Sequence, residues 1–169
     1  MTETFVISKE VAKEIDHWLS KYPPNQRRSA VVTALTEVQK QNGGFLTEAS
    51  MKAVAQYLNI PEIEVYEVAS FYDMYEFKPV GKHLIRICTN LSCMLRGSEE
   101  IVAHFKKRLG VGLGETTADG EFTLRESECL AACGGAPMCQ VDDRDYHENL
   151  TPEKMDALLE TLKKETHGG

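Results

Sequence analysis

Residues 84–93 read LIRICTNLSC, an apolar run that leads into two cysteines. The run is typical of a short strand, and it ends at Cys88. Cys93 follows, and after a gap of 35 residues come Cys129 and Cys133, so the pattern is C-x4-C and then C-x3-C. Four thiolates form the ligand set of a [2Fe–2S] cluster, two for each iron. The sequence therefore predicts a one-electron carrier.

Four cysteines can also hold zinc. A structural zinc site uses the same ligands, although zinc knuckles more often have C-x2-C spacing. A zinc-stabilised adaptor without redox function is therefore an alternative from another class. A thioredoxin-type dithiol needs C-x-x-C, and a Rieske centre needs two histidine ligands. The chain has no C-x-x-C, and no histidine closely follows a cysteine.

The fifth cysteine, Cys139, lies in a predicted strand, residues 138–141. Free cysteine is a common small core residue. We therefore expect Cys139 to be buried and not to be a ligand.

The composition fits one globular domain or two small ones. The chain has 169 residues, 42% of them hydrophobic, and no apolar run approaches the roughly 20 residues of a membrane span. The net charge of −7 disfavours nucleic acid and anionic membranes, which attract basic patches. The first residues, MTETF, have no basic segment, so we expect no leader. Five cysteines without a leader indicate a reducing compartment rather than disulfides.

The pattern of the chain changes near Lys78-Pro79-Val80-Gly81. Before this break, apolar residues recur with helical spacing. Ser8 and Thr47 are suited to cap helices, and Pro61 is suited to the first position of another. The predicted helices span residues 8–21, 29–42, 47–58 and 62–71. They form a helical bundle at residues 1–80, for which we expect a role in docking a partner.

After the break, strands and helices alternate. Predicted strands cover residues 84–88, 121–125, 138–141 and 146–148. We expect Ser98 to cap a helix that ends at Leu109, and Thr151 to begin a last helix. The order βαβ followed by ββα is the thioredoxin-like topology. The predicted fold class is α+β, with an N-terminal helical bundle and then a thioredoxin-like [2Fe–2S] ferredoxin domain at residues 81–169.

On this topology the two cysteine pairs converge. Each pair follows the carboxyl end of a strand in the same sheet, where open α/β sheets tend to bind ligands. Gly134 and Gly135 let backbone N–H groups approach the sulfur atoms. Pro137 precedes a strand, where thioredoxin-like proteins place a cis-proline, so we expect a cis Ala136–Pro137 bond.

One glycine-rich segment, residues 110–114, resembles a nucleotide-binding loop only superficially. The third glycine of G-x-G-x-x-G would fall on Glu115, and the segment follows a helix instead of a strand. We therefore find no NAD or flavin fingerprint and no catalytic residue on this chain.

Several segments resemble the E subunit of NADH:quinone oxidoreductase, respiratory complex I. Cys88–Gly97 is similar to its first cluster motif, and Glu128–Cys133 with Ala136-Pro137-Met138 is similar to its second. Residues 65–72 and 79–82 match the helical part. The similarity extends from about residue 15 to residue 162. Cys139 departs from the family, which usually has another residue there.

The resemblance implies one [2Fe–2S] cluster on Cys88, Cys93, Cys129 and Cys133, close to the FMN of a partner flavoprotein subunit. That partner binds NADH, FMN and a [4Fe–4S] cluster, so this chain is part of an oxidoreductase without a complete active site of its own. The complex passes electrons to quinone and pumps protons. Bacterial members are cytoplasmic and are held at the inner membrane by the larger complex, without inserting themselves.

Related subunits occur in NAD-dependent formate dehydrogenases and NAD(P)-linked hydrogenases, with the same cluster and another terminal partner. The sequence leaves these assignments open beside complex I.

Overall fold

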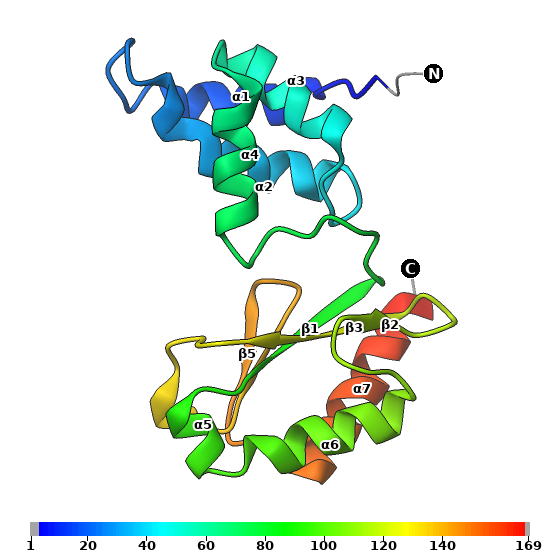
Figure 1. The fold of residues 1–169 in the computed structure, drawn as a ribbon. Coiled ribbons are helices and arrows are strands. Elements are labelled where there is room, and N and C mark those ends of the chain that lie inside the picture. The colour runs from blue at the N-terminus through cyan, green and yellow to red at the C-terminus, as the bar shows by residue number, and fades with distance from the viewer. Residues whose placement is uncertain (1–3, 168–169) are drawn as a thin grey trace. The chain divides into compact units, whose positions relative to one another are not determined.

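The computed structural model describes residues 4–167, with side chains up to residue 164. The chain divides between Pro79 and Val80 into two compact units, which we call the helical unit and the sheet unit (Figure 1). In the described residues, all the strands and all five cysteines lie in the sheet unit. This mixed architecture confirms the predicted α+β fold class.

The helical unit contains four α-helices among its described residues: α1 (Lys9–Leu19), α2 (Val31–Gln41), α3 (Glu48–Leu58) and α4 (Glu62–Phe71). The predicted caps are confirmed, because Ser8 Oγ accepts a 3.2 Å hydrogen bond from Val11 N and Thr47 forms a capping box with Ser50. The buried core draws on all four helices and includes Ile15, Leu35, Val38, Val54, Leu58 and Val65.

Two helix starts in this unit differ from the prediction. The predicted helix from Ser29 begins at Val31, because a 3-10 turn, Arg27–Ala30, precedes it. Pro61 was predicted at the first position of a helix, and this is wrong. Its ψ of 141° is extended, so Pro61 is the N-cap residue and α4 begins one residue later.

The sheet unit is built on a five-stranded sheet with the order β2-β3-β1-β4-β5. Its strands are β1 (His83–Cys88), β2 (Glu115–Thr116), β3 (Phe122–Ser127), β4 (Cys139–Val141) and β5 (Asp145–His147). β1 and β3 are parallel neighbours, whereas β4 pairs with β1 and β5 in the antiparallel sense. The predicted βαβ–ββα order is confirmed, with β2 as an additional edge strand.

Two long helices, α6 (Ser98–Leu109) and α7 (Pro152–His167), contact each other in the sheet unit (Figure 1). The main core of this unit joins them to the sheet and includes Ile85, Ile87, Phe105, Phe122, Leu124, Cys139 and Met155. Side chains alternate along a strand, so Cys88 points to the opposite face from Ile87. The Cys88 side chain therefore points away from the main core at the end of β1.

Several local predictions for the sheet unit are corrected. Ser98 was expected to cap a helix, but it is the first helical residue, and the N-cap is Gly97 at φ 90° with no side-chain cap bond. The short helix α5 (Leu91–Leu95) and strand β2 were not predicted. β5 begins one residue earlier than expected. The expected cis Ala136–Pro137 bond is present.

Candidate iron–sulfur site

The first cysteine pair is buried and held by regular structure. Cys88 is the last residue of β1, and its N–H donates to Met138 O at 3.2 Å. Cys93 lies in α5, and the N-cap residue of this helix is Asn90, whose side chain accepts a hydrogen bond from Leu91 N at 2.8 Å. The two thiols are hydrogen-bonded to each other, and Cys93 is only 1% exposed. The loop between β1 and α5 therefore brings this pair into direct contact.

The second pair is exposed and lies in the loop after β3. Cys133 begins a 3-10 turn, Cys133–Gly135, and Cys129 precedes it by four residues. The parallel register places Cys88 opposite Ser127, two residues before Cys129. The loops that carry the two pairs therefore leave the sheet side by side at the carboxyl ends of neighbouring parallel strands, as the sequence predicted.

A small apolar cluster joins the two loops. It contains Cys88, Cys93, Leu130, Ala136 and Met138, with Ala132 packed against it. Cys133 is near enough to Cys93 to influence its ionisation. Within residues 4–167 no group of three or more His, Cys, Asp or Glu side chains is closed tightly enough to hold a metal ion. The structure thus brings Cys88 and Cys93 together and leaves the second pair exposed.

Burial raises the pKa of the Cys93 thiol to about 11. The hydrogen bond and the charge of Cys88 act in the same direction, and a hydrogen bond from the Met138 backbone opposes them. A thiol with this pKa is protonated at neutral pH. Metal binding at Cys93 must therefore release a proton, because the thiolate is the form that coordinates metals.

Backbone groups of the cysteine loops face the sulfur atoms. Ala131 N donates to Cys129 Sγ at 3.4 Å, and Ala131 has the left-handed φ of 59° that turns its N–H back toward the sulfur. The Met138 backbone similarly bonds to the Cys93 thiol. Donors to sulfur tune the properties of a metal centre bound there.

The residues present fit a [2Fe–2S] cluster. They supply four thiol donors on adjacent loops, an apolar wall on one side and backbone donors directed at sulfur. Cys139 does not join this set: it is 0% exposed and packs in the main core of the sheet unit, where burial raises its pKa to about 12. Leu130 and Met138 lie in the segments that resemble the second cluster motif, but the sequence did not predict that their side chains pack against Cys88 and Cys93.

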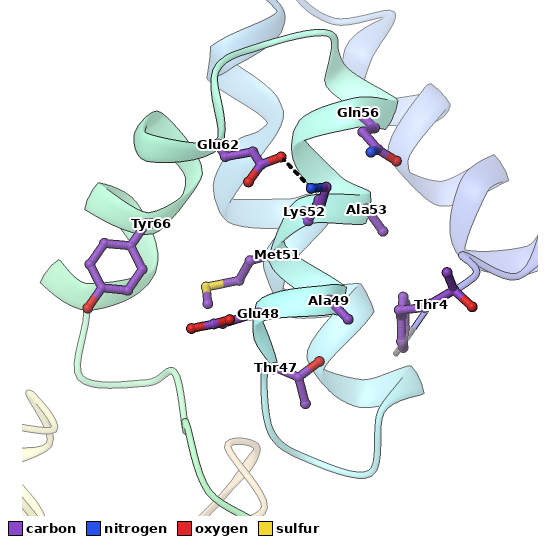
Figure 2. Close-up of a pocket in the computed structure, with 11 residues that line it drawn as sticks. Thr4, Thr47, Glu48, Ala49, Met51, Lys52, Ala53, Gln56, Glu62 and Tyr66 are labelled. Carbon is purple, nitrogen blue, oxygen red and sulfur yellow. Dashed lines mark ion pairs between the residues drawn. The ribbon is translucent and has the colours of Figure 1, made fainter. Parts of the chain in front are cut away.

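A hollow of about 740 Å³ lies in the helical unit (Figure 2). It is lined by residues of α3 and α4 together with Thr4 and Phe5. Figure 2 shows Lys52 beside Glu62, an ion pair with a distance of 3.2 Å. No cysteine lines this hollow, so it is separate from the candidate iron–sulfur site.

Two cysteine pairs at the carboxyl edge of a thioredoxin-like sheet define the class of thioredoxin-like iron–sulfur proteins. In agreement with this, the family model described as thioredoxin-like [2Fe–2S] ferredoxin matches residues 15–163. The chain belongs to that family. The matched range includes all four paired cysteines and also α2, α3 and α4 of the helical unit.

Similar proteins agree with the resemblance seen in the sequence. The NADH-quinone oxidoreductase E subunit from Rickettsia bellii is 46% identical over 147 residues, which are 87% of each chain. The mitochondrial NADH dehydrogenase [ubiquinone] flavoprotein 2 from Dictyostelium discoideum is 42% identical over 159 residues, 94% of this chain and 64% of that protein. The expected membership of the E-subunit family is confirmed.

A solved structure shares the fold. The NAD+-reducing [NiFe]-hydrogenase in the air-oxidised state matches 82% of this chain and 23% of its own, with a TM-score of 0.63 at 19% identity. In the part of this chain that the structure describes, no helix is long and apolar enough to cross a membrane.

Proposed function

We propose that this chain is the electron-transfer subunit of the NADH dehydrogenase part of a proton-pumping NADH:quinone oxidoreductase and carries one [2Fe–2S] cluster. The observation that carries this proposal is the pairing of two cysteine loops at one edge of the sheet, in a chain 42–46% identical to NADH-quinone oxidoreductase E subunits over most of its length. The chain contributes to an oxidoreductase without a complete active site of its own.

Four thiolates would hold the cluster, with Cys88 and Cys93 on one iron and Cys129 and Cys133 on the other. When bound, the cluster supplies a site for one electron. Leu130 and Met138 pack beside the first pair and limit the access of water to it. The Ala131 N–H is placed to donate a hydrogen bond to the Cys129 sulfur. The buried pair thus anchors the site, and the exposed pair faces outward.

The partner in this proposal is the flavoprotein subunit that binds NADH, FMN and a [4Fe–4S] cluster. An electron exchanged with FMN would pass through the exposed side of the site, near Cys129 and Cys133. Leu91 and Leu95 of α5 are exposed apolar residues close in sequence to Cys93, and they suit a protein contact at this end of the unit. The complex would lie at the cytoplasmic face of the inner membrane, with this chain peripheral to it.

We assign docking to the helical unit as well. α4 is apolar on both sides: Val65 and Ala69 are buried, whereas Ile63 and Tyr66 are exposed, and Phe71 at its end is 80% exposed. A helix of this kind in a soluble protein is usually covered by another element or chain. The exposed face of α4 therefore supports a role in binding a partner protein.

The proposal is tested on the chain purified anaerobically. A visible absorption spectrum, iron and sulfide analysis and the EPR signal after reduction should report two irons per chain in one [2Fe–2S] cluster. A colourless protein that contains zinc would instead support the zinc-stabilised adaptor. Isolation of the native complex identifies the partners, because formate dehydrogenase or hydrogenase subunits in place of quinone-reducing ones would contradict the assignment to NADH:quinone oxidoreductase.

A further inference from the structure

Ser98 has a buried hydroxyl group that finds no partner within the described part of the chain. The residue is 1% exposed, and its Oγ makes no hydrogen bond there. Because a buried polar group without a partner destabilises the folded state, such groups call for an explanation. Helix capping does not provide one, since Gly97 is the N-cap of α6 and Ser98 follows it.

The topology places this hydroxyl at the cysteine edge of the sheet. α6 connects the parallel strands β1 and β3, and such a crossover helix runs back along the sheet, so that its N-terminus lies at the carboxyl ends of the strands. Cys88 ends β1 at this edge, and the loop with the second cysteine pair leaves from it too.

Local structure also holds Ser98 close to the first pair. Arg96 N donates to Cys93 O at 3.1 Å and Gly97 N donates to Met94 O at 3.0 Å, so two tight turns fold the start of α6 back onto α5. Along α6, Ser98 shares the buried face with Ile101 and Phe105, which point into the unit. Ser98 is therefore the first residue of the buried face of α6, at the end of the helix that follows α5.

The N-terminus of α6 is a second source of partial positive charge at this edge of the sheet. The first N–H groups of a helix have no partner within the helix and carry partial positive charge. The Gly97 N-cap has no side chain to accept hydrogen bonds from them. Donor groups and a positive dipole end thus gather where the cysteine loops meet, an arrangement suited to sulfur atoms that carry negative charge.

We propose that Ser98 is a positioning and tuning residue whose hydroxyl donates a hydrogen bond to the Cys93 thiolate when the cluster is bound. This inference rests on the proposed [2Fe–2S] site. A donor to sulfur stabilises the more negative, reduced state, and so Ser98 raises the reduction potential. This hydrogen bond also gives the buried Ser98 hydroxyl a partner, which removes its unfavourable contribution to the stability of the folded state when the cluster is bound.

The test compares the full-length wild type with Ser98→Ala, Ser98→Thr and the control Ser50→Ala. Ser50 is also buried, but its hydroxyl donates to Thr47 O at 2.9 Å within the helical unit. Each protein is analysed for iron, sulfide and EPR signal, and then titrated with redox dyes. At a fixed solution potential, Ser98→Ala should lower the ratio of reduced to oxidised cluster about three- to tenfold; tenfold corresponds to 59 mV for one electron. Ser98→Thr should restore the ratio, and Ser50→Ala should not change it.

Urea unfolding of the cluster-free proteins gives an independent readout. Ser98→Ala removes a hydroxyl without a partner and should be no less stable than wild type, whereas Ser50→Ala loses a satisfied hydroxyl and should be less stable. A Ser98→Ala protein that folds normally but fails to retain iron would also support the proposal. A cluster-loaded Ser98→Ala protein with the wild-type midpoint potential would overturn it, and so would a loss of stability in the cluster-free state. Wild type without iron would overturn the proposed function itself, which makes the two failures distinguishable.

Discussion

Replacing Cys139 with serine separates the fold of the sheet unit from its proposed cluster chemistry. Cys139 is fully buried and packs among residues such as Ile85, Phe105 and Met155. Its strand neighbours are Ile87 on one side and His147 on the other. A serine hydroxyl in this apolar setting should cost about 1–3 kcal/mol of unfolding free energy if it finds no partner. Cys139→Ala removes only about a methylene's worth of packing and should cost about 1 kcal/mol.

Both variants should retain the full iron content and the wild-type EPR signal, because Cys139 lies in the main core and outside the cluster of residues around Cys88 and Cys93. The assay pairs iron and sulfide analysis of the loaded proteins with urea unfolding. The order of stability should be wild type, then Cys139→Ala, then Cys139→Ser. Loss of the cluster from folded variants of both kinds would refute the reasoning, since it would make Cys139 a ligand.

The raised pKa of Cys139 makes the unfolding free energy depend on pH. Burial raises its pKa from 9.0 to about 12, so the folded state keeps the proton longer than the unfolded state. Its contribution to stability is therefore complete below pH 9 and is lost as the pH rises toward 12. Between pH 9 and pH 10 the unfolding free energy of wild type should fall by about 1 kcal/mol relative to Cys139→Ala. Parallel pH profiles for the two cluster-free proteins would contradict this.

Three further predictions concern the ligands, the helical unit and one glycine. The proposed ligands are Cys88, Cys93, Cys129 and Cys133. Replacing any one of them with alanine should abolish or strongly destabilise the cluster. A variant with wild-type iron content and EPR signal would remove that residue from the ligand set. Deleting residues 1–77 should keep the cluster but lose binding to the flavoprotein in co-purification; undiminished binding would transfer docking to the sheet unit. Gly81→Ala should cost about 1–3 kcal/mol in urea unfolding, because its Cβ would lie 2.9 Å from the Phe122 backbone. Gly134→Ala, with no atom within 4 Å of the added Cβ, is the control, and an equal cost for both would exclude a steric cause.

Much of the fold could be predicted from the sequence, because the local residue pattern of most segments favours the same helix or strand that the tertiary structure requires. Ser8 and Thr47 mark helix starts with side chains that bond the first turn, and the apolar run before Cys88 is typical of a short strand that is buried on both faces. The errors fall where several backbone solutions have similar energies. Serine is a common N-cap residue, which favoured Ser98 for this position. Gly97 readily adopts a positive φ, however, and it is the N-cap one residue earlier.

For the candidate site, spacing alone placed the cysteine pairs on neighbouring loops, because the loops after parallel strands meet at one edge. It did not indicate that one pair is buried and the other exposed. That difference depends on Leu130, Ala136 and Met138, which pack in one cluster with Cys88 at the end of β1 and Cys93 in α5. Such packing leaves no periodic signal in the sequence.

The unequal burial of the two pairs constrains how the proposed site can work. Cys88 and Cys93 are fixed by β1 and α5 and covered by apolar side chains, so they determine where the site lies in the fold. Cys129 and Cys133 lie in an exposed loop. If the four thiolates share a cluster, electrons reach it most directly from this exposed side, and a partner that covers the loop also shields the reduced state from water. The Ser98 hydroxyl is itself buried, so solvent does not compete with it for a sulfur atom. Tuning of the potential and contact with the partner would then depend on different residues, and variants of Ser98 should change the potential without weakening the contact with the partner.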